Sequence, residues 1–140
     1  MRVLIDTNVV VDVLQNREPM AEHGRKIFLA AARQQFIGCI TAKEVADLHF
    51  FARKQFRGQE NVDEKARGII AKLLALFEVI DTTGSDCRAA LGSQNGDYED
   101  AMMIAAALRE HLDGIVTGNE RHFTTASLPV YTPDKFIALL

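Results

Sequence analysis

The chain has 140 residues, of which 48% are hydrophobic and 25% charged, and its net charge at neutral pH is −3. This length suits a single domain spanning residues 1–140, and the composition excludes a disordered chain and a membrane-spanning one. The first apolar run, Val3 to Ile5, stops at Asp6. We therefore expect no secretory signal peptide and a cytoplasmic protein.

The first forty residues predict two strands separated by helices. Val3 to Ile5 is a short apolar run typical of a strand, and Asp6-Thr7-Asn8 then supplies capping groups for a helix that reaches about Gln15. Helical spacing of apolar residues predicts a second helix from Ala21 to about Gln34, and Phe36 to Ile40 predicts the second strand.

The middle of the chain repeats this alternation. Thr41 followed three residues later by Glu44 is a capping-box sequence, which predicts a helix from about Ala42 to Phe56. Apolar residues at helical spacing from Ala66 to Phe77 predict the next helix, and a third strand is expected near Phe77 to Ile80.

The last third of the chain predicts three further helices and two short strands. The helices are expected from Ser85 to about Ser93, from Tyr98 to His111 and from Pro133 to Leu139, and the strands at Ile115 to Thr117 and at Val130-Tyr131. Because Ala101 to Leu108 is apolar all round, we expect that helix at the centre of the structure. Helices that alternate with short apolar strands predict an α/β fold with a parallel sheet of four or five strands and helices on both faces.

Polar and acidic residues follow the predicted strands. Asp6 comes directly after the first strand, Glu44 lies in the first turn after the second, and Asn119 follows the strand at 115–117. Asp97 and Asp100 open the long apolar helix. Since ligands of such sheets gather at the carboxyl ends of the strands, and crowded carboxylates repel one another unless a cation or protons intervene, the pattern favours a Mg²⁺ or Mn²⁺ site that activates water against a phosphodiester.

Helix capping is the alternative explanation for each acid taken singly. Asp6 and Asp97 sit where N-caps are expected, Glu44 completes a capping box, and Asp100 is a first-turn acid that complements the helix dipole. Capping does not explain why these residues fall at the same end of successive strand–helix units. We therefore favour the metal site.

Other residue types give weaker signals. Cys39 and Cys87 are too few for a disulfide scaffold and lack zinc-site spacing, so we expect buried, reduced thiols. The histidines have no paired spacing and are interpreted as surface or hydrogen-bonded groups; they are His23, His49, His111 and His122.

Three segments resemble the PIN-domain family of small metal-dependent nucleases. They are "VLIDTNVVVDVL", "ITAKEVADL" and "DYEDAMMIAAALREHLDGIVTGNERHF", in the family's order and spacing over essentially the whole chain. The resemblance implies a three-layer α/β/α fold and a Mg²⁺- or Mn²⁺-dependent ribonuclease, most often a VapC-type toxin that dimerises and is inhibited by a small antitoxin. It implies Asp6, Glu44 and Asp100 as metal ligands and Asn119 as the fourth position, with Glu120 and Asp97 as alternatives.

Two positions depart from the family pattern. Gly118 stands where a basic residue is common, and His122 stands where an acid commonly precedes the final Phe. These departures leave open a catalytically inactive binding module beside the toxin and beside a housekeeping RNA-processing nuclease.

Charge and hydroxyl positions suggest how RNA is held. Residues 17–57 carry a net charge of +4 and residues 58–140 a net charge of −6. We expect Arg53, Lys54 and Arg57 to form a positive rim that binds the phosphate backbone, although the same residues complement the negative end of their own helix. Thr7 and Thr117 are expected to orient water or phosphate.

The family habit and the ample apolar content also predict a homodimer. The candidates for the shared face, each also suited to the core, are Phe50, Phe51, Ile69 and Leu73.

Overall fold

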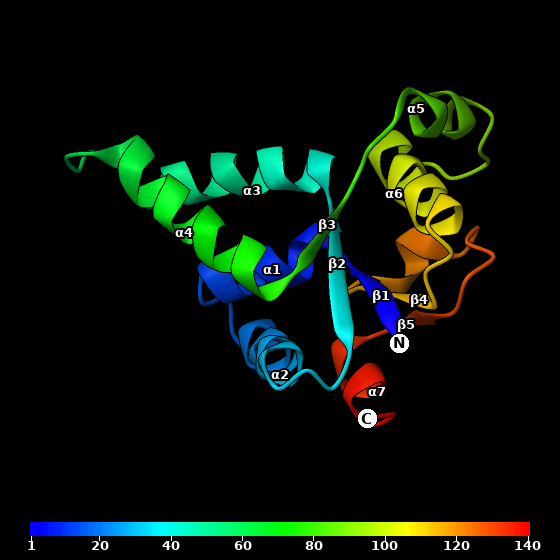
Figure 1. Ribbon diagram of the computed structural model, residues 1–140, viewed down its shortest axis with the longest axis horizontal. Helices are drawn as coiled ribbons and strands as arrows, with labels where there is room; N and C mark the ends of the chain where they lie inside the picture. Colours follow the sequence, from blue (N-terminus) through cyan, green and yellow to red (C-terminus); the bar gives the residue numbers. More distant parts are fainter.

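A five-stranded sheet forms the middle layer of the computed structural model, which describes residues 1–140 (Figure 1). Its strands are β1 (Arg2–Ile5), β2 (Ile37–Thr41), β3 (Glu78–Ile80), β4 (Gly114–Val116) and β5 (Val130–Tyr131), in the order β3-β2-β1-β4-β5. All four strand pairs are parallel. The predicted parallel sheet and three-layer α/β/α fold are confirmed.

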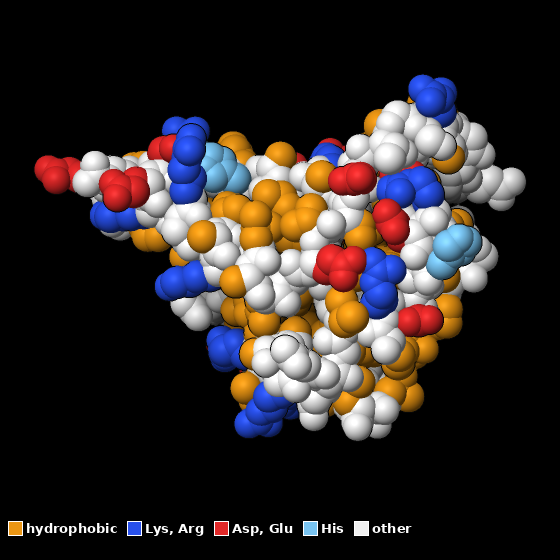
Figure 2. Space-filling view, viewed as in Figure 1, with side chains coloured by type: hydrophobic (Ala, Val, Ile, Leu, Met, Phe, Trp, Pro, Cys, Tyr) orange, Lys and Arg blue, Asp and Glu red, His pale blue; other side chains and the backbone are white.

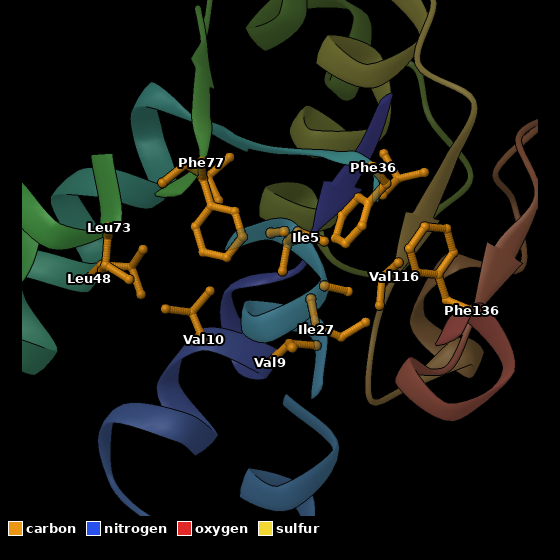
Figure 3. Close-up of a cluster of buried hydrophobic side chains, with 14 of the residues drawn as sticks. Ile5, Val9, Val10, Ile27, Phe36, Leu48, Leu73, Phe77, Val116 and Phe136 are labelled. Carbon is orange, nitrogen blue, oxygen red and sulfur yellow. The ribbon is translucent and has the colours of Figure 1, made fainter. Parts of the chain in front are cut away.

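Alternating side chains of the strands feed two separate cores. Val3 and Ile5 of β1 point into a cluster of 15 buried residues, part of which Figure 3 shows, whereas Leu4 points into a cluster of 10 on the opposite face. This alternation follows from the two-residue period of a strand. Because both faces are covered, β1 is apolar and buried from Val3 to Ile5, after the partly exposed Arg2, and it is the central strand of the sheet.

Five helices cover the face that carries the larger core. They are α1 (Thr7–Leu14), α2 (Met20–Ala32), α3 (Ala42–Gln55), α4 (Val62–Leu76) and α7 (Pro133–Ile137). The opposite layer contains α5 (Gly84–Leu91), α6 (Tyr98–Arg109) and a 3₁₀ helix, η1 (Glu120–Phe123), which the sequence did not predict. None of the helices is long and apolar enough to cross a bilayer.

The α3–α4 hairpin projects as an arm beyond the edge of the sheet, and α5 with the start of α6 rises on the other side (Figure 1). Helix α3 begins at a capping box in which Thr41 Oγ1 accepts from the backbone N–H of Glu44 and the Glu44 carboxylate accepts from the N–H of Thr41. Helix α1 starts two residues after β1, and α3 starts immediately after β2. The first turns of both helices therefore lie at the carboxyl edge of the sheet.

The expectation that the apolar helix lies at the centre of the structure is wrong. Helix α6 is in an outer layer: Met103 and Ala107 are buried on the sheet, but Leu108 is 41% exposed. The segment is hydrophobic in composition because it is rich in alanine. Alanine side chains on the outward face expose little apolar surface, so this face is stable in contact with water.

The four residues predicted for a dimer face differ in their exposure to solvent. Leu73 is a core residue with 4% exposure, so its assignment to a shared surface is wrong. Phe51 and Ile69 are partly buried against the same core, and Phe50 is 58% exposed.

The two cysteines are both free thiols. Cys39 is fully buried in β2, and burial raises the pKa of its thiol to about 11. Cys87 is only half-buried, so the expected burial is confirmed for Cys39 alone.

Candidate metal centre

Six acidic residues line one cavity of about 420 Å³ at the carboxyl edge of the sheet, and four of them are the acids predicted for the site. Asp6 follows β1, Glu44 lies in the first turn of α3, and Asp97 and Asp100 start α6. We call this space the acidic cavity. Its remaining lining residues are Thr7, Asn8, Lys43, Asp47, Phe50, Phe51, Glu99, Met103 and His122.

Asp6 is held in place from the neighbouring strand. Its backbone N–H donates to Val116 O over 2.9 Å, which extends the pairing of β1 with β4. The fully buried Thr117 donates its hydroxyl to Asp6 Oδ2 over 2.7 Å. Burial raises the pKa of the Asp6 carboxyl, and the bond from Thr117 opposes that rise by stabilising the carboxylate. Thr117 therefore acts on the cavity through Asp6.

Both oxygens of Glu44 accept hydrogen bonds. Oε1 accepts from the N–H of Thr41 over 2.9 Å, and Oε2 accepts from the hydroxyl of Thr7 over 3.0 Å. The side chain is 1% exposed, and burial, together with the charge of Asp6, raises its pKa to about 8. The capping-box interpretation is confirmed, and the carboxyl group also forms part of the cavity wall, so the two roles coexist.

Asp97 and Asp100 lie one helical turn apart at the start of α6. Asp97 Oδ1 caps the helix by accepting from the N–H of Asp100 over 3.0 Å. Asp100 Oδ2 is buried and has no hydrogen-bond partner. Burial first, and then the negative charges of Asp97 and Asp6, raise the pKa of Asp100 to about 6.

This donor set fits a hard divalent cation. An unpartnered buried carboxylate oxygen is costly, and carboxylates that raise one another's pKa are stabilised when a cation is placed among them. Oxygen ligands of this kind suit Mg²⁺ or Mn²⁺. No group of three His, Cys, Asp or Glu side chains is close enough to hold an ion in the conformation of the structure, so binding requires these side chains to rotate toward one another.

Of the three candidates for the fourth position, Asp97 lines the acidic cavity, and the other two differ in their contacts. Asn119 lies beside the acidic cavity, where its Nδ2 is 3.1 Å from His122 Nε2 and its backbone N–H donates to Thr117 Oγ1. Glu120 forms an ion pair with Lys135 over 3.1 Å instead. Neither residue lines the cavity.

His122 lines the acidic cavity, although the sequence analysis noted it only as a departure from the family pattern. It was interpreted as a surface or hydrogen-bonded group, and its side chain is 52% exposed, yet it lines the acidic cavity with Nδ1 3.5 Å from Asp100 Oδ2. Its position three residues after Asn119 was the feature of the sequence that could have placed it near the site. His23 and His49 do form the expected surface contacts, with Asp134 and Asp63 respectively.

Lys43 is a second cavity residue that the sequence analysis missed. Its ammonium group pairs with Asp47 on α3 and with Glu99 on α6, the latter over 2.9 Å. It thus bridges the two sides of the cavity mouth and offsets part of the negative charge there.

The predicted basic rim surrounds a neighbouring cavity. Arg53, Lys54 and Arg57 line a space of about 410 Å³ on the α3–α4 arm, where Lys54 Nζ lies 4.8 Å from the centre of the Phe50 ring. We call this the basic cavity. Phe50 lines both cavities, and Figure 2 shows Lys and Arg side chains along this arm together with Asp and Glu side chains toward its tip. The basic and acidic cavities are therefore adjacent and share only Phe50.

Comparisons with known proteins agree with this architecture. The family model described as PIN domain matches residues 2–121. Among solved structures, VapBC2 from Rickettsia felis bound to a promoter DNA fragment aligns with a TM-score of 0.68 and 16% identity, covering 94% of this chain and 98% of the other. DNA-bound VapBC from Salmonella typhimurium gives a TM-score of 0.66 and 22% identity, covering 95% and 98%.

A third similar structure is a VapC from Mycobacterium tuberculosis described as a sarcin-ricin loop cleaving toxin, with a TM-score of 0.62, 10% identity and coverage of 91% and 98%. At these identities the likeness to solved structures establishes the fold. The curated proteins contain no significant match.

Proposed function

The chain belongs to the PIN-domain family, and from this membership we propose that it is a divalent-metal-dependent endoribonuclease, the toxin of a toxin–antitoxin pair. The observation that carries the proposal is the acidic cavity, which six carboxyl groups line and in which Asp100 Oδ2 is buried without a hydrogen bond. A fold alone does not give a function. The chemistry of the cavity is what points to a nuclease.

We assign the metal-holding role to Asp6, Glu44, Asp97 and Asp100, with Asn119 as an outer contact beside them. A bound Mg²⁺ or Mn²⁺ would lower the pKa of water and neutralise charge on the phosphodiester in the transition state. Thr117 fixes the orientation of Asp6 through a 2.7 Å hydrogen bond. Thr7 donates to Glu44 from the first turn of α1, so it holds that carboxylate and presents its own oxygen to the cavity.

The RNA backbone would be held next to this cavity. Arg53, Lys54 and Arg57 form the basic cavity that Phe50 joins to the acidic one. Cationic side chains supply most of the sequence-independent affinity for a phosphate backbone. A strand drawn to these residues would cross the carboxylates, where the metal offsets the repulsion between phosphate and acids.

An antitoxin and a second copy of the chain are the proposed protein partners. Several of the similar structures are described as VapBC or toxin–antitoxin complexes. The exposed Phe50 ring on the projecting arm gives such a partner an apolar contact. A housekeeping RNA-processing nuclease would use the same site without an antitoxin.

A second candidate, an inactive RNA-binding module, is favoured by the surroundings of the fourth position. Asn119 contacts His122 and Glu120 pairs with Lys135, so no acid from the segment after β4 lines the cavity. The nuclease and the inactive binding module would share the fold, and only the nuclease would cleave RNA.

Cleavage of single-stranded RNA by the purified chain tests the proposal. We expect cleavage in Mg²⁺ or Mn²⁺, none in EDTA, and a loss of at least about a hundredfold in rate for Asp100→Asn. The control is Glu64→Gln, an exposed acid in the first turn of α4. Metal-independent cleavage, or full activity of Asp100→Asn, would contradict the nuclease site; tight RNA binding without cleavage would select the inactive module.

A further inference from the structure

A third cavity, of about 340 Å³, opens beside the acidic cavity and shares no lining residue with the basic one. It is formed by the loop at 94–96 and the segment 121–125, and no hydrophobic residue lines it. We call it the polar cavity. Asp97 and His122 line both it and the acidic cavity, and Phe50 joins the acidic cavity to the basic one. The three cavities therefore form a series with the carboxylates in the middle.

Asn95 fixes the walls of the polar cavity. Its Nδ2 donates to His122 O over 2.7 Å and to Thr125 Oγ1 over 3.2 Å, while its Oδ1 accepts from the N–H of Asp97 over 2.9 Å. The first two bonds join the loop before α6 to η1 and to the residues that follow it, and the third fixes the loop itself. The cavity is thus held open before any ligand arrives, a property that lowers the entropic cost of binding.

Three other side chains of this cavity have no partner inside the protein. Gln94, Arg121 and Thr124 are exposed and take part in no hydrogen bond or ion pair of the chain. Hydration would satisfy each of them if they were scattered over the surface. Here they share one cavity and offer an amide, a guanidinium group and a hydroxyl group next to the carboxylates.

We propose that the polar cavity is a nucleotide-binding subsite that reads the base next to the scissile phosphodiester. This inference rests on the proposed nuclease function and adds the determinant of sequence preference. Arg121 binds the phosphate of that nucleotide, because guanidinium groups match phosphate geometry. Gln94 and Thr124 hydrogen-bond the base edge, which is accessible in single-stranded RNA. The basic cavity positions the strand on the other side, since phosphate contacts position and base contacts specify.

Sequencing the products cut from a randomised single-stranded RNA tests the base-reading residues. We expect the parent protein to prefer one base at a single position beside the cut by about tenfold, as one good base contact allows. In Gln94→Ala/Thr124→Ala the preference at that position should fall to about twofold or less, while cutting continues. A parent that cuts all sequences equally, or a double variant with unchanged preference, would overturn the subsite.

Salt-dependent RNA binding tests Arg121. In an Asp100→Asn background, which prevents cleavage, we expect Arg121→Gln to weaken binding of every sequence several-fold and to reduce the slope of log affinity against log salt by about 0.7. The matched control is Arg33→Gln, an exposed arginine at the end of α2 without an ion pair. Equal slopes in the two variants would refute the phosphate contact.

The outcomes separate the two proposals. If the parent cuts RNA but the polar-cavity variants keep its preference and slope, the subsite is wrong and the nuclease proposal stands. If the parent neither binds nor cuts RNA in Mg²⁺ or Mn²⁺, both are wrong. Thermal unfolding of every variant verifies that the exposed substitutions leave the fold intact.

Discussion

Glu44 combines a structural and a chemical role in one side chain. As the N3 residue of α3 it accepts from the N–H of Thr41, and as a cavity residue it lies near the charge of Asp6. The capping bonds favour the ionised form and burial opposes it, with burial the larger effect. In the metal-free protein the carboxyl group therefore holds a proton over most of the neutral range.

This protonation predicts that the metal-free fold loses stability as pH rises. The pKa of Glu44 is about 8 in the folded state against 4.5 for the ordinary group, so between these values the folded state binds more protons than the unfolded one. The free energy of unfolding should fall by up to about 1.4 kcal/mol per pH unit for this one proton. Urea unfolding in EDTA at pH 5 and pH 8 measures it.

The neutral variant Glu44→Gln isolates this effect. Glutamine also completes a capping box, so the variant should be more stable than the parent at pH 8 by at least about 1 kcal/mol and nearly equal at pH 5. Glu64→Gln, an exposed acid, should leave the pH dependence unchanged. A pH dependence that Glu44→Gln does not alter would contradict the raised pKa.

We expect Asp100→Asn to weaken metal binding without destabilising the metal-free protein. Burial and the charges of Asp97 and Asp6 oppose ionisation of Asp100, and Asp100→Asn removes the repulsion between these carboxylates, so without metal the fold should be as stable as the parent or slightly more so. Mn²⁺ affinity, measured by calorimetric titration, should fall by about tenfold or more. A destabilisation of several kcal/mol in EDTA would instead identify Asp100 as a structural residue.

At the scale of elements, α5 and α6 are joined by a partly buried ion pair that the sequence analysis did not foresee. Asp86 completes the capping box of α5 with Thr83 and is 2% exposed. Arg109, at the end of α6, donates to both its oxygens over 3.0 and 3.1 Å. These bonds keep the pKa of Asp86 below its usual value against the effect of burial.

Breaking this ion pair should destabilise the whole layer. Arg109→Gln leaves a buried carboxylate with its capping bond alone, and we expect a loss of about 2 kcal/mol at pH 7. Arg88→Gln, an exposed arginine on α5, is the control with little expected effect. Chemical denaturation of the three proteins decides the point, and a change below about 0.5 kcal/mol would show that the pair is not stabilising.

We expect the basic residues at the end of α3 to contribute to the salt dependence of RNA binding. Replacement of Arg53, Lys54 and Arg57 by Gln should lower the slope of log affinity against log salt by about 0.7 for each phosphate that these residues bind, with Mn²⁺ affinity unchanged. If these residues only complement the dipole of α3, the slope will stay the same. Fluorescence anisotropy with labelled RNA measures it, with a control triple of exposed residues, namely Arg17, Arg33 and Lys72 replaced by Gln.

At the scale of the whole molecule, the projecting arm is covered on one side only. Its inner residues pack against the larger core, whereas the Phe50 ring is 58% exposed. Together with the family membership this predicts a homodimer in solution.

Sedimentation velocity at micromolar concentration should give twice the mass of the chain. Phe50→Ser should shift the protein toward the monomer, while Leu29→Ser, on α2 and 50% exposed, should not. A parent protein that sediments as a monomer throughout would refute self-association.

Local chemistry in the sequence determined most of the elements, and the resemblance of three segments to PIN domains indicated the family. The Thr41–Glu44 capping box predicted the start of α3, and the short apolar runs predicted the five strands of the parallel sheet. The acids placed after strands do line one cavity. These features depend on neighbours within a few residues or on the general rule that parallel strands end at one edge, so they are readable without coordinates.

The tertiary structure decided which side chains meet. Whether Glu120 joins the acids or pairs with Lys135, and whether His122 lies at the surface or beside Asp100, depends on the path of η1 across the sheet edge. The exposure of Leu108 and the Asp86–Arg109 pair likewise depend on how α5 packs on α6. Burial and charge contacts between distant residues set these outcomes, and hydrophobic periodicity along the chain carries no information about them.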